Sequence, residues 1–262
     1  MMTIAAEPVS SARKPPVWLY STELARSSVD FWALAASYPM LATLPRGQRH
    51  PVLVLPGFMT NDRWTVTLRG LLRTLGYQAH GWRLGRNVGP TAQVLDGLSA
   101  RLDELHGRYG QPVTLIGWSL GGVFARQLAR SHPEQVRQVI TLGSPFRLAR
   151  HDQSWAAPIY SRFEHRHAER LQLPLESDAA PLPVPSTSIY SRIDGIVAWQ
   201  TCVDRPGEQA ENIAVWSSHF GFGHHPAVIW AIADRLAQPA GRWAPFQAPA
   251  LLRAAFAATD TT

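Results

Sequence analysis

A serine flanked by glycines, where an apolar run meets a helical pattern, is the feature that most constrains the fold. Residues 113–122 read Val-Thr-Leu-Ile-Gly-Trp-Ser-Leu-Gly-Gly. Gly117 and Gly121 have no side chains to clash in a tight turn, and Gly122 lets a helix lie close to a strand. The pattern predicts a buried strand that ends in a sharp turn, holds Ser119 in a strained backbone conformation and continues into a helix.

Apolar runs and helical stripes alternate on both sides of this turn. The apolar runs predict six strands, over 50–55, 77–82, 113–116, 136–142, 187–191 and 212–216. The stripes predict helices over 62–75, 91–107, 119–131 and 226–237. Strands that alternate with helices indicate an α/β fold, with a mostly parallel sheet of about six strands and helices on both faces.

The segments outside this alternation complete the predicted organisation. Residues 146–185 are long for a bare connection, so we expect a small cap insertion with one helix near 154–170. The predicted parts are a disordered N-terminus (1–16), an N-terminal helical segment (17–49), an α/β domain (50–238) containing the cap, and a C-terminal tail (239–262) with a short helix near 248–257.

Aromatic and aliphatic residues recur through 17–44 and predict one or two amphipathic helices, over about 18–27 and 28–43. Packing onto the core is the favoured explanation of these side chains. Weak contact with a membrane surface and the lining of a substrate entrance are the alternatives.

The charge balance argues against nucleic-acid binding. The net charge is +6, but Lys14 is the only lysine and the arginines are scattered, with no basic block and no nucleic-acid-binding motif. Cys202 is the only cysteine, so no intrachain disulfide can form, and we expect it to be a buried thiol. With no signal-peptide pattern and no run long enough to span a membrane, the expected location is cytoplasmic.

Ser119 needs a base and an acid if it is to act as a nucleophile, because a serine hydroxyl reacts poorly until its proton is removed. Ligands of open α/β sheets bind beyond the carboxyl ends of strands, so both partners should follow strands. Asp194 follows the run that ends at Ser191 and is the favoured acid; Asp204 is its main rival, ahead of the cap residues Glu176 and Asp178.

His219 is the favoured base because it is the first histidine after the 212–216 strand, and a glycine-rich loop follows it. His224 and His225 are rivals that would otherwise cap or flank the last helix. His151, His165 and His167 belong to the cap. His165 and His167 have no further ligands at metal-binding spacing, so we expect no metal.

An oxyanion hole needs two backbone N–H groups that point at the developing negative charge. Leu120, the residue after the serine, supplies one. The loop after the first strand, Leu55-Pro56-Gly57-Phe58-Met59, supplies the other. Phe58 is the favoured donor and Met59 the second choice. The loop over 82–89 is expected to line the pocket or to form a simple turn.

The order nucleophile, acid, base on this topology resembles the α/β-hydrolase superfamily, especially its esterase and lipase branch. The resemblance covers about residues 50–238. It departs from the usual pattern because the chain before residue 50 reads as helical, so the first two strands of the larger members are missing. The resemblance implies a two-step acyl-enzyme mechanism without a cofactor, and it implies no particular substrate.

The leading hypothesis is therefore a serine hydrolase that cleaves carboxylic esters of apolar small molecules or lipids, with Ser119, Asp194 and His219 as catalytic residues. An acyltransferase, thioesterase or amidase with the same triad is the alternative. A non-catalytic binding module is the least favoured reading, because all the expected groups are present.

Overall fold

One parallel sheet forms the centre of the computed structural model, which describes residues 9–168 and 181–257. Its six strands lie in the order β2-β1-β3-β4-β5-β6, and all five pairings are parallel. The strands are β1 (Pro51–Leu55), β2 (Gln78–Gly81), β3 (Val113–Trp118), β4 (Val136–Leu142), β5 (Ser186–Ser191) and β6 (Ala210–Val215). The predicted α/β architecture is confirmed, and each strand lies within two residues of its predicted range.

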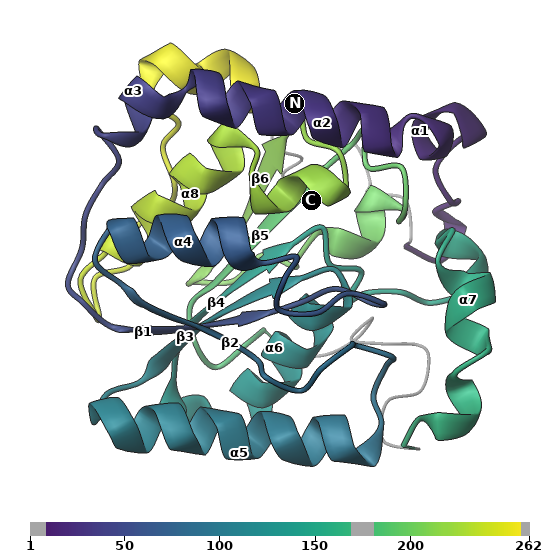
Figure 1. The fold of residues 1–262 in the computed structure, drawn as a ribbon, viewed down its shortest axis with the longest axis horizontal. Coiled ribbons are helices and arrows are strands. Elements are labelled where there is room, and N and C mark those ends of the chain that lie inside the picture. Colours follow the sequence, from purple (N-terminus) through teal and green to yellow (C-terminus); the bar gives the residue numbers. More distant parts are fainter. Residues whose placement is uncertain (1–8, 169–180, 258–262) are drawn as a thin grey trace.

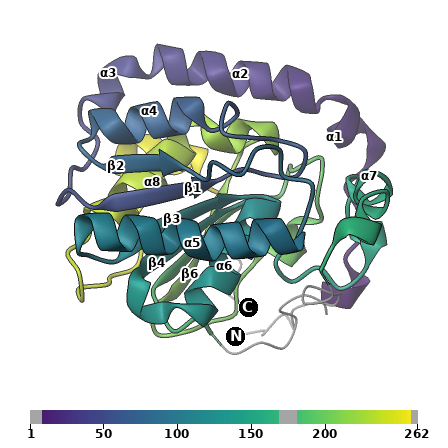
Figure 2. The same ribbon diagram turned by 60° about the horizontal axis from the view of Figure 1, so that its bottom comes forward.

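Helices cover both faces of the sheet (Figure 1). α4 (Val66–Thr74) and α8 (Pro226–Ala237) lie on one face, beneath α1 (Val17–Ser21), α2 (Glu23–Ala36) and α3 (Tyr38–Leu41). α5 (Ala92–Tyr109) and α6 (Leu120–Ser131) lie on the other face, and Figure 2 turns this side forward. Each face has its own cluster of buried apolar side chains, so the sheet is sandwiched between two cores.

α5 shows why these segments fold as predicted. The Thr91 side chain accepts a hydrogen bond from Val94 N and caps the first turn, and Gly110 ends the helix with φ 63°. The predicted apolar stripe lies buried against the sheet: Val94, Leu98, Leu102 and Leu105.

α4 begins at Val66, four residues later than the periodicity predicts. The cause is Asp62, whose carboxylate accepts hydrogen bonds from Trp82 N and Arg83 N, both at 3.0 Å. Asp62 thereby ties the segment before α4 to the end of β2 and keeps it in turns instead of helix.

The N-terminal segment also differs from expectation. The structure has three helices where the sequence predicts one or two, because the chain turns at Thr22 and again before Pro39. Residues 9–16 are held in place, although composition assigns them to a disordered terminus. Gln153 Nε2 donates to the Val9 carbonyl at 2.6 Å, and Trp155 Nε1 donates to the Pro15 carbonyl at 2.9 Å. The first eight residues lie outside the described part of the chain.

The cap region contains α7 (Ala157–Ser161) and short 3₁₀ turns at 151–153 and 164–166, where the sequence pattern predicts one longer helix. α7 lies beside α1 in both views, and the Tyr20 and Trp155 rings stack at 4.9 Å between these regions (Figures 1 and 2). Glu176 and Asp178 lie outside the described residues.

The C-terminal tail runs back along the edge strand β6. Ala257 N donates to the Ala214 carbonyl at 2.9 Å, and Phe246 packs on Phe256 with ring centroids 5.0 Å apart. The predicted helix near 248–257 is a 3₁₀ turn over Ala250–Ala255. Within residues 9–168 and 181–257, none of the helices combines the length and the apolar character that crossing a membrane requires.

Candidate active site

Ser119 occupies the turn between β3 and α6 with φ 52° and ψ −122°, a conformation that a residue with a side chain rarely adopts. The surrounding glycines permit it. A Cβ at Gly117 would lie 2.3 Å from Gly122 Cα, and one at Gly121 would lie 2.4 Å from the Leu55 carbonyl oxygen. The strain at Ser119 is thus fixed by close backbone contacts on both sides of the turn.

Asp194 and His219 form a buried pair beyond the ends of β5 and β6. Asp194 Oδ2 lies 2.6 Å from His219 Nδ1. Asp194 Oδ1 accepts hydrogen bonds from Ile196 N at 2.8 Å and Val197 N at 2.9 Å, which fixes the carboxylate plane. The two side chains are only 1% and 4% exposed. This arrangement leaves Nε2 of the imidazole as the nitrogen that can exchange a proton with a partner.

Trp118 connects this pair to the serine turn. Its indole Nε1 donates to the His219 carbonyl at 3.1 Å, and its ring lies 6.2 Å from the imidazole. Among the described residues no hydrogen bond joins Ser119 Oγ to His219 Nε2. Such bonds are commonly long in the absence of substrate and tighten when it binds.

The electrostatics of His219 favour a base of raised strength. Burial lowers the pKa of His219, while the charge and hydrogen bond of Asp194, followed by the charge of Glu23, raise it. The balance leaves the pKa above the ordinary value of 6.5. The imidazole is therefore suited to accept a proton from a nearby hydroxyl.

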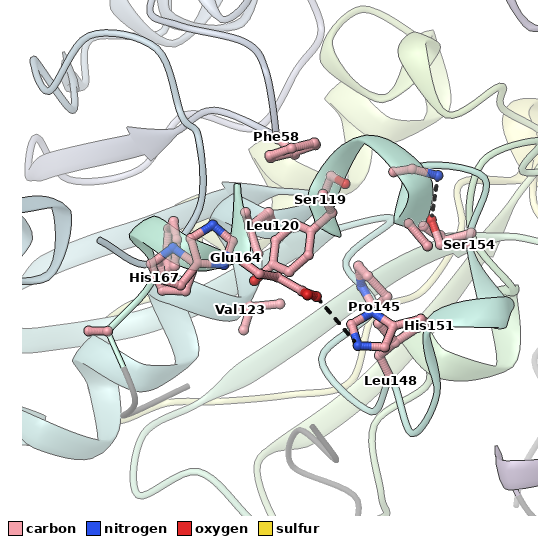
Figure 3. Close-up of a pocket in the computed structure, with 17 residues that line it drawn as sticks. Phe58, Ser119, Leu120, Val123, Pro145, Leu148, His151, Ser154, Glu164 and His167 are labelled. Carbon is pink, nitrogen blue, oxygen red and sulfur yellow. Dashed lines mark hydrogen bonds and ion pairs between the residues drawn. The ribbon is translucent and has the colours of Figure 1, made fainter. Parts of the chain in front are cut away.

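The two residues expected to supply oxyanion donors are Phe58 and Leu120. Phe58 and Leu120 both line the pocket beside Ser119 (Figure 3). In the described part of the chain neither N–H has a hydrogen-bond acceptor, and a free N–H is expected for the first residue of a helix such as α6. Met59 N instead donates to the Asn87 carbonyl at 2.7 Å, so it is unavailable to a substrate.

Asn87 holds this loop in shape, which sequence reasoning did not identify. Its Nδ2 donates to the Pro56 carbonyl at 2.9 Å, and its backbone binds both Met59 and Thr60. Asn87 is fully buried. The sequence marks the 82–89 loop as a turn near the pocket, but nothing in it specifies this contact, because the partners lie about thirty residues away in the chain.

A cavity of about 490 Å³ opens beside Ser119, between α6 and the cap. Figure 3 shows Phe58, Leu120 and Val123 around the serine, with His151 and Glu164 on the cap side. Further lining side chains are mostly apolar: Phe124, Pro145, Leu148, Ala156, Ala157, Tyr160 and Val197.

The cap contributes the polar part of the wall. His151 Nε2 lies 3.6 Å from Glu164 Oε1, and His167 Nε2 lies 2.8 Å from the Val88 carbonyl. Burial, followed by the charge of Glu164, raises the pKa of Tyr160 to about 12, so this phenol stays neutral. The cavity is therefore apolar near the serine and polar toward the cap.

The rival acid Asp204 has a different role. It accepts two hydrogen bonds from the buried Arg126 guanidinium, at 2.6 and 3.2 Å, and one from Ser186 Oγ at 3.2 Å. Arg126 also lies over the Phe146 ring at 3.9 Å. Asp204 thus links α6 to the segment after β5, and within the described residues none of its hydrogen bonds involves a histidine.

The rival histidines are also engaged elsewhere. His224 Nε2 lies 3.0 Å from the Ser27 carbonyl, and His225 Nδ1 accepts a hydrogen bond from Ala227 N as the cap of α8.

Cys202 is buried, and burial raises the pKa of its thiol well above the ordinary value. In the described ranges, no group of three or more His, Cys, Asp or Glu side chains is arranged to hold a metal ion.

Comparison with known proteins agrees with this architecture. A family model described as the α/β hydrolase fold matches residues 101–180, which include the serine turn. A pimeloyl-[acyl-carrier protein] methyl ester esterase from Shewanella woodyi is 32% identical over 110 residues, covering 42% of each chain. One from Aeromonas hydrophila is 51% identical over 45 residues, covering 17% of this chain and 18% of that protein. The chain spans less than half the length of these curated relatives.

Solved structures with similar folds include two lipases. Lipase B of Aspergillus fumigatus superposes with a TM-score of 0.59 at 16% identity, over 76% of this chain and 56% of that chain. A mature lipase of Bacillus licheniformis superposes with a TM-score of 0.55 at 17% identity, over 74% and 94%. At these identities the likeness establishes the fold alone.

Proposed function

The chain has the α/β-hydrolase fold, as its sequence resemblance predicts, and on that premise we propose that it hydrolyses carboxylic esters through an acyl-enzyme on Ser119. The observation that carries the proposal is the position of the strained Ser119. It lies at the wall of a cavity, and it follows the carboxyl end of a strand, as do both residues of the buried Asp194–His219 pair. The ester substrates in the names of the relatives support the same reaction class.

In this mechanism His219 Nε2 takes the proton of Ser119 Oγ as the oxygen attacks the ester carbonyl carbon. The N–H groups of Phe58 and Leu120 stabilise the negative charge that develops on the carbonyl oxygen. Asp194 stabilises the imidazolium through its 2.6 Å contact with Nδ1. His219 then returns the proton to the leaving alcohol. Water next attacks the acyl carbon as His219 takes its proton, and His219 gives that proton to Ser119 Oγ as the carboxylic acid leaves.

The cavity favours an apolar acyl or alcohol group. Leu120, Val123 and Phe124 form the wall next to Ser119, so a hydrocarbon placed there leaves water for an apolar surface. The polar cap side suits a group that keeps some contact with water. We therefore assign the substrate class as small esters or lipids with an apolar chain.

Steady-state hydrolysis of a p-nitrophenyl ester series of increasing chain length tests the proposal. Ser119→Ala should abolish turnover, whereas Ser131→Ala, at the far end of α6, should leave it unchanged. The kcat/KM of the wild type should rise from acetate to medium-length chains. Full activity of purified Ser119→Ala would disprove the mechanism, and a preference for acetate would disprove the assigned substrate class.

The exposed side of α1 and α2 supports a second part of the proposal, contact with an anionic lipid surface. Between Pro15 and Pro45 the only charged residues are Glu23, Arg26 and Asp30, and all three bind other parts of the protein. Large apolar side chains face outward instead: Val17, Trp18, Leu24, Val29, Phe31 and Trp32. These apolar side chains gather in one short segment, whereas exposed apolar residues on soluble proteins are normally scattered singly.

Lipid is the occupant that the surrounding charges favour. Arg13 and Arg46 are exposed at the two ends of this helical segment, and the chain carries a net charge of +6. An apolar helical face flanked by arginines matches the interfacial region of an anionic membrane.

Flotation with phosphatidylglycerol-containing vesicles tests this contact. Trp32→Glu should abolish co-flotation, because Trp32 is 70% exposed at the centre of the face. Ala100→Glu adds the same charge to the exposed side of α5 and should leave binding intact. Absence of wild-type binding, or dimers in gel filtration that Trp32→Glu dissociates, would contradict the lipid assignment.

A further inference from the structure

The side chains of an ion pair on α2 form hydrogen bonds with the backbone on both sides of Asp194. Glu23 and Arg26 lie one turn apart, with Arg26 Nη2 2.7 Å from Glu23 Oε1. Arg26 Nη1 donates to the Ile193 carbonyl at 2.7 Å, and Glu23 Oε1 accepts from Gly195 N at 2.7 Å. The residues immediately before and after Asp194 are therefore held by one pair of side chains from a distant part of the chain.

The same carboxylate reaches the loop that carries His219. Glu23 Oε1 accepts from His219 N at 3.2 Å, and Oε2 accepts from Phe220 N at 3.3 Å. Glu23 is 2% exposed, so it is a buried charge whose ligands are a guanidinium and three backbone N–H groups. Gly195 makes the approach possible, because a Cβ there would lie 2.7 Å from Glu23 Oε1.

Asp30, two turns further along α2, accepts hydrogen bonds from Ser218, the residue before His219. Its Oδ2 accepts from Ser218 N at 3.1 Å and from Ser218 Oγ at 2.7 Å. A Cβ at Gly221 would lie 1.9 Å from the same oxygen. α2 thus contacts the His219 loop through two buried carboxylates.

We propose that Glu23 is a positioning residue, which bridges the Asp194 and His219 loops and keeps their side chains aligned for proton transfer with Ser119. This inference rests on the proposed function. Misplacing a reacting group by about 1 Å costs up to about 100-fold in rate, so a rigid bridge between the two loops has a direct effect on turnover.

The charge of Glu23 also acts on the imidazole. The charged groups near His219 are Asp194, Glu23 with its partner Arg26, and Asp30 behind Ser218. Burial lowers the pKa of His219, and Asp194 and then Glu23 raise it. Removing the charge of Glu23 therefore lowers the pKa of the imidazole, an effect that a purely structural contact would not produce.

Glu23→Gln tests the proposal because the amide keeps the size of the side chain but removes the charge and one acceptor. Glu104→Gln is the matched control, since Glu104 also pairs with an arginine one turn away, on the exposed side of α5. Two quantities are measured in each variant: kcat and KM for an ester, and the pKa of His219 from a proton–nitrogen NMR titration that needs no substrate.

We expect kcat of Glu23→Gln to fall about 10- to 100-fold with little change in KM, and the NMR pKa of His219 to fall below that of the wild type. Glu104→Gln should change neither. Glu23→Asp, which keeps the charge but is one methylene shorter, should lose kcat while holding the His219 pKa closer to the wild type.

A Glu23→Gln protein that is folded, with wild-type kcat and an unchanged His219 pKa, would overturn the proposal. A fall in kcat no larger than that of Glu104→Gln would also overturn the proposal. If the wild type shows no Ser119-dependent hydrolysis, the proposed function fails, and the NMR titration still decides the case of Glu23. An unchanged imidazole pKa then removes the effect of Glu23 on His219, and a lowered one retains it.

Discussion

Two buried aspartates, Asp194 and Asp204, follow β5 within ten residues of each other, and the structure gives them different partners. Asp194 accepts a hydrogen bond from His219, whereas Asp204 binds Arg126 through two hydrogen bonds of 2.6 and 3.2 Å. Replacing each with asparagine keeps the shape and removes the charge. The pair of variants therefore separates catalysis from stability.

For Asp204→Asn we expect a loss of stability with activity retained. The change removes the Asp204 charge from beside the buried Arg126 guanidinium, and breaking a buried pair in this way costs about 3 kcal/mol. For a chain of this size, that loss lowers Tm by roughly 6–12 °C. The kcat per folded molecule should stay at the wild-type value, because Asp204 touches neither Ser119 nor His219.

For Asp194→Asn we expect a loss of activity with stability retained. An asparagine cannot hold the imidazole in the required tautomer or stabilise its charged form, and kcat should fall about 10⁴-fold. Thermal unfolding followed by circular dichroism, with ester hydrolysis normalised to folded protein, measures both effects. A large loss of kcat in Asp204→Asn at unchanged Tm, together with near-normal turnover in Asp194→Asn, would refute the assignment of roles.

Two further predictions follow from the same geometry. The kcat/KM of the wild type should rise with pH through the pKa of His219, because the base must be neutral to accept the Ser119 proton. Since that pKa lies above 6.5, the midpoint of the rise in kcat/KM should also lie above pH 6.5. A midpoint at or below pH 6.5 would contradict the charge arrangement around His219. Gly121→Ala should abolish activity and lower Tm, because its Cβ would lie 2.4 Å from the Leu55 carbonyl oxygen. Gly107→Ala, in α5 with no atom within 4 Å of the new Cβ, should instead raise stability by about 0.5–1 kcal/mol in urea unfolding.

Local patterns were sufficient to predict the parts of this fold that depend on neighbouring residues. The strand, turn and helix around Ser119 are specified within ten residues, by an apolar run and by glycines whose positions leave no room for a side chain. Asp194 and His219 follow from topology, because parallel strands bring their carboxyl ends to one edge. The structure places these two side chains 2.6 Å apart.

Contacts between distant segments are absent from such patterns. Glu23 lies 172 residues before Gly195, and nothing near either residue in the sequence indicates their 2.7 Å hydrogen bond. The spacing of apolar residues predicts amphipathic helices in the 17–44 segment, but it does not show which charged side chains face inward. It also misplaces the start of α4, because the Asp62 side chain is used to hold the end of β2.

Covalent labelling of Ser119 tests the central claim most directly. The intact protein is treated with a fluorophosphonate, and the modified peptide is identified by mass spectrometry. The account predicts one adduct per chain, on Ser119, that forms much more slowly in His219→Ala and is absent from Ser119→Ala. An adduct on another residue, or a folded wild-type protein that remains unlabelled, would contradict the assignment of Ser119 as an activated nucleophile.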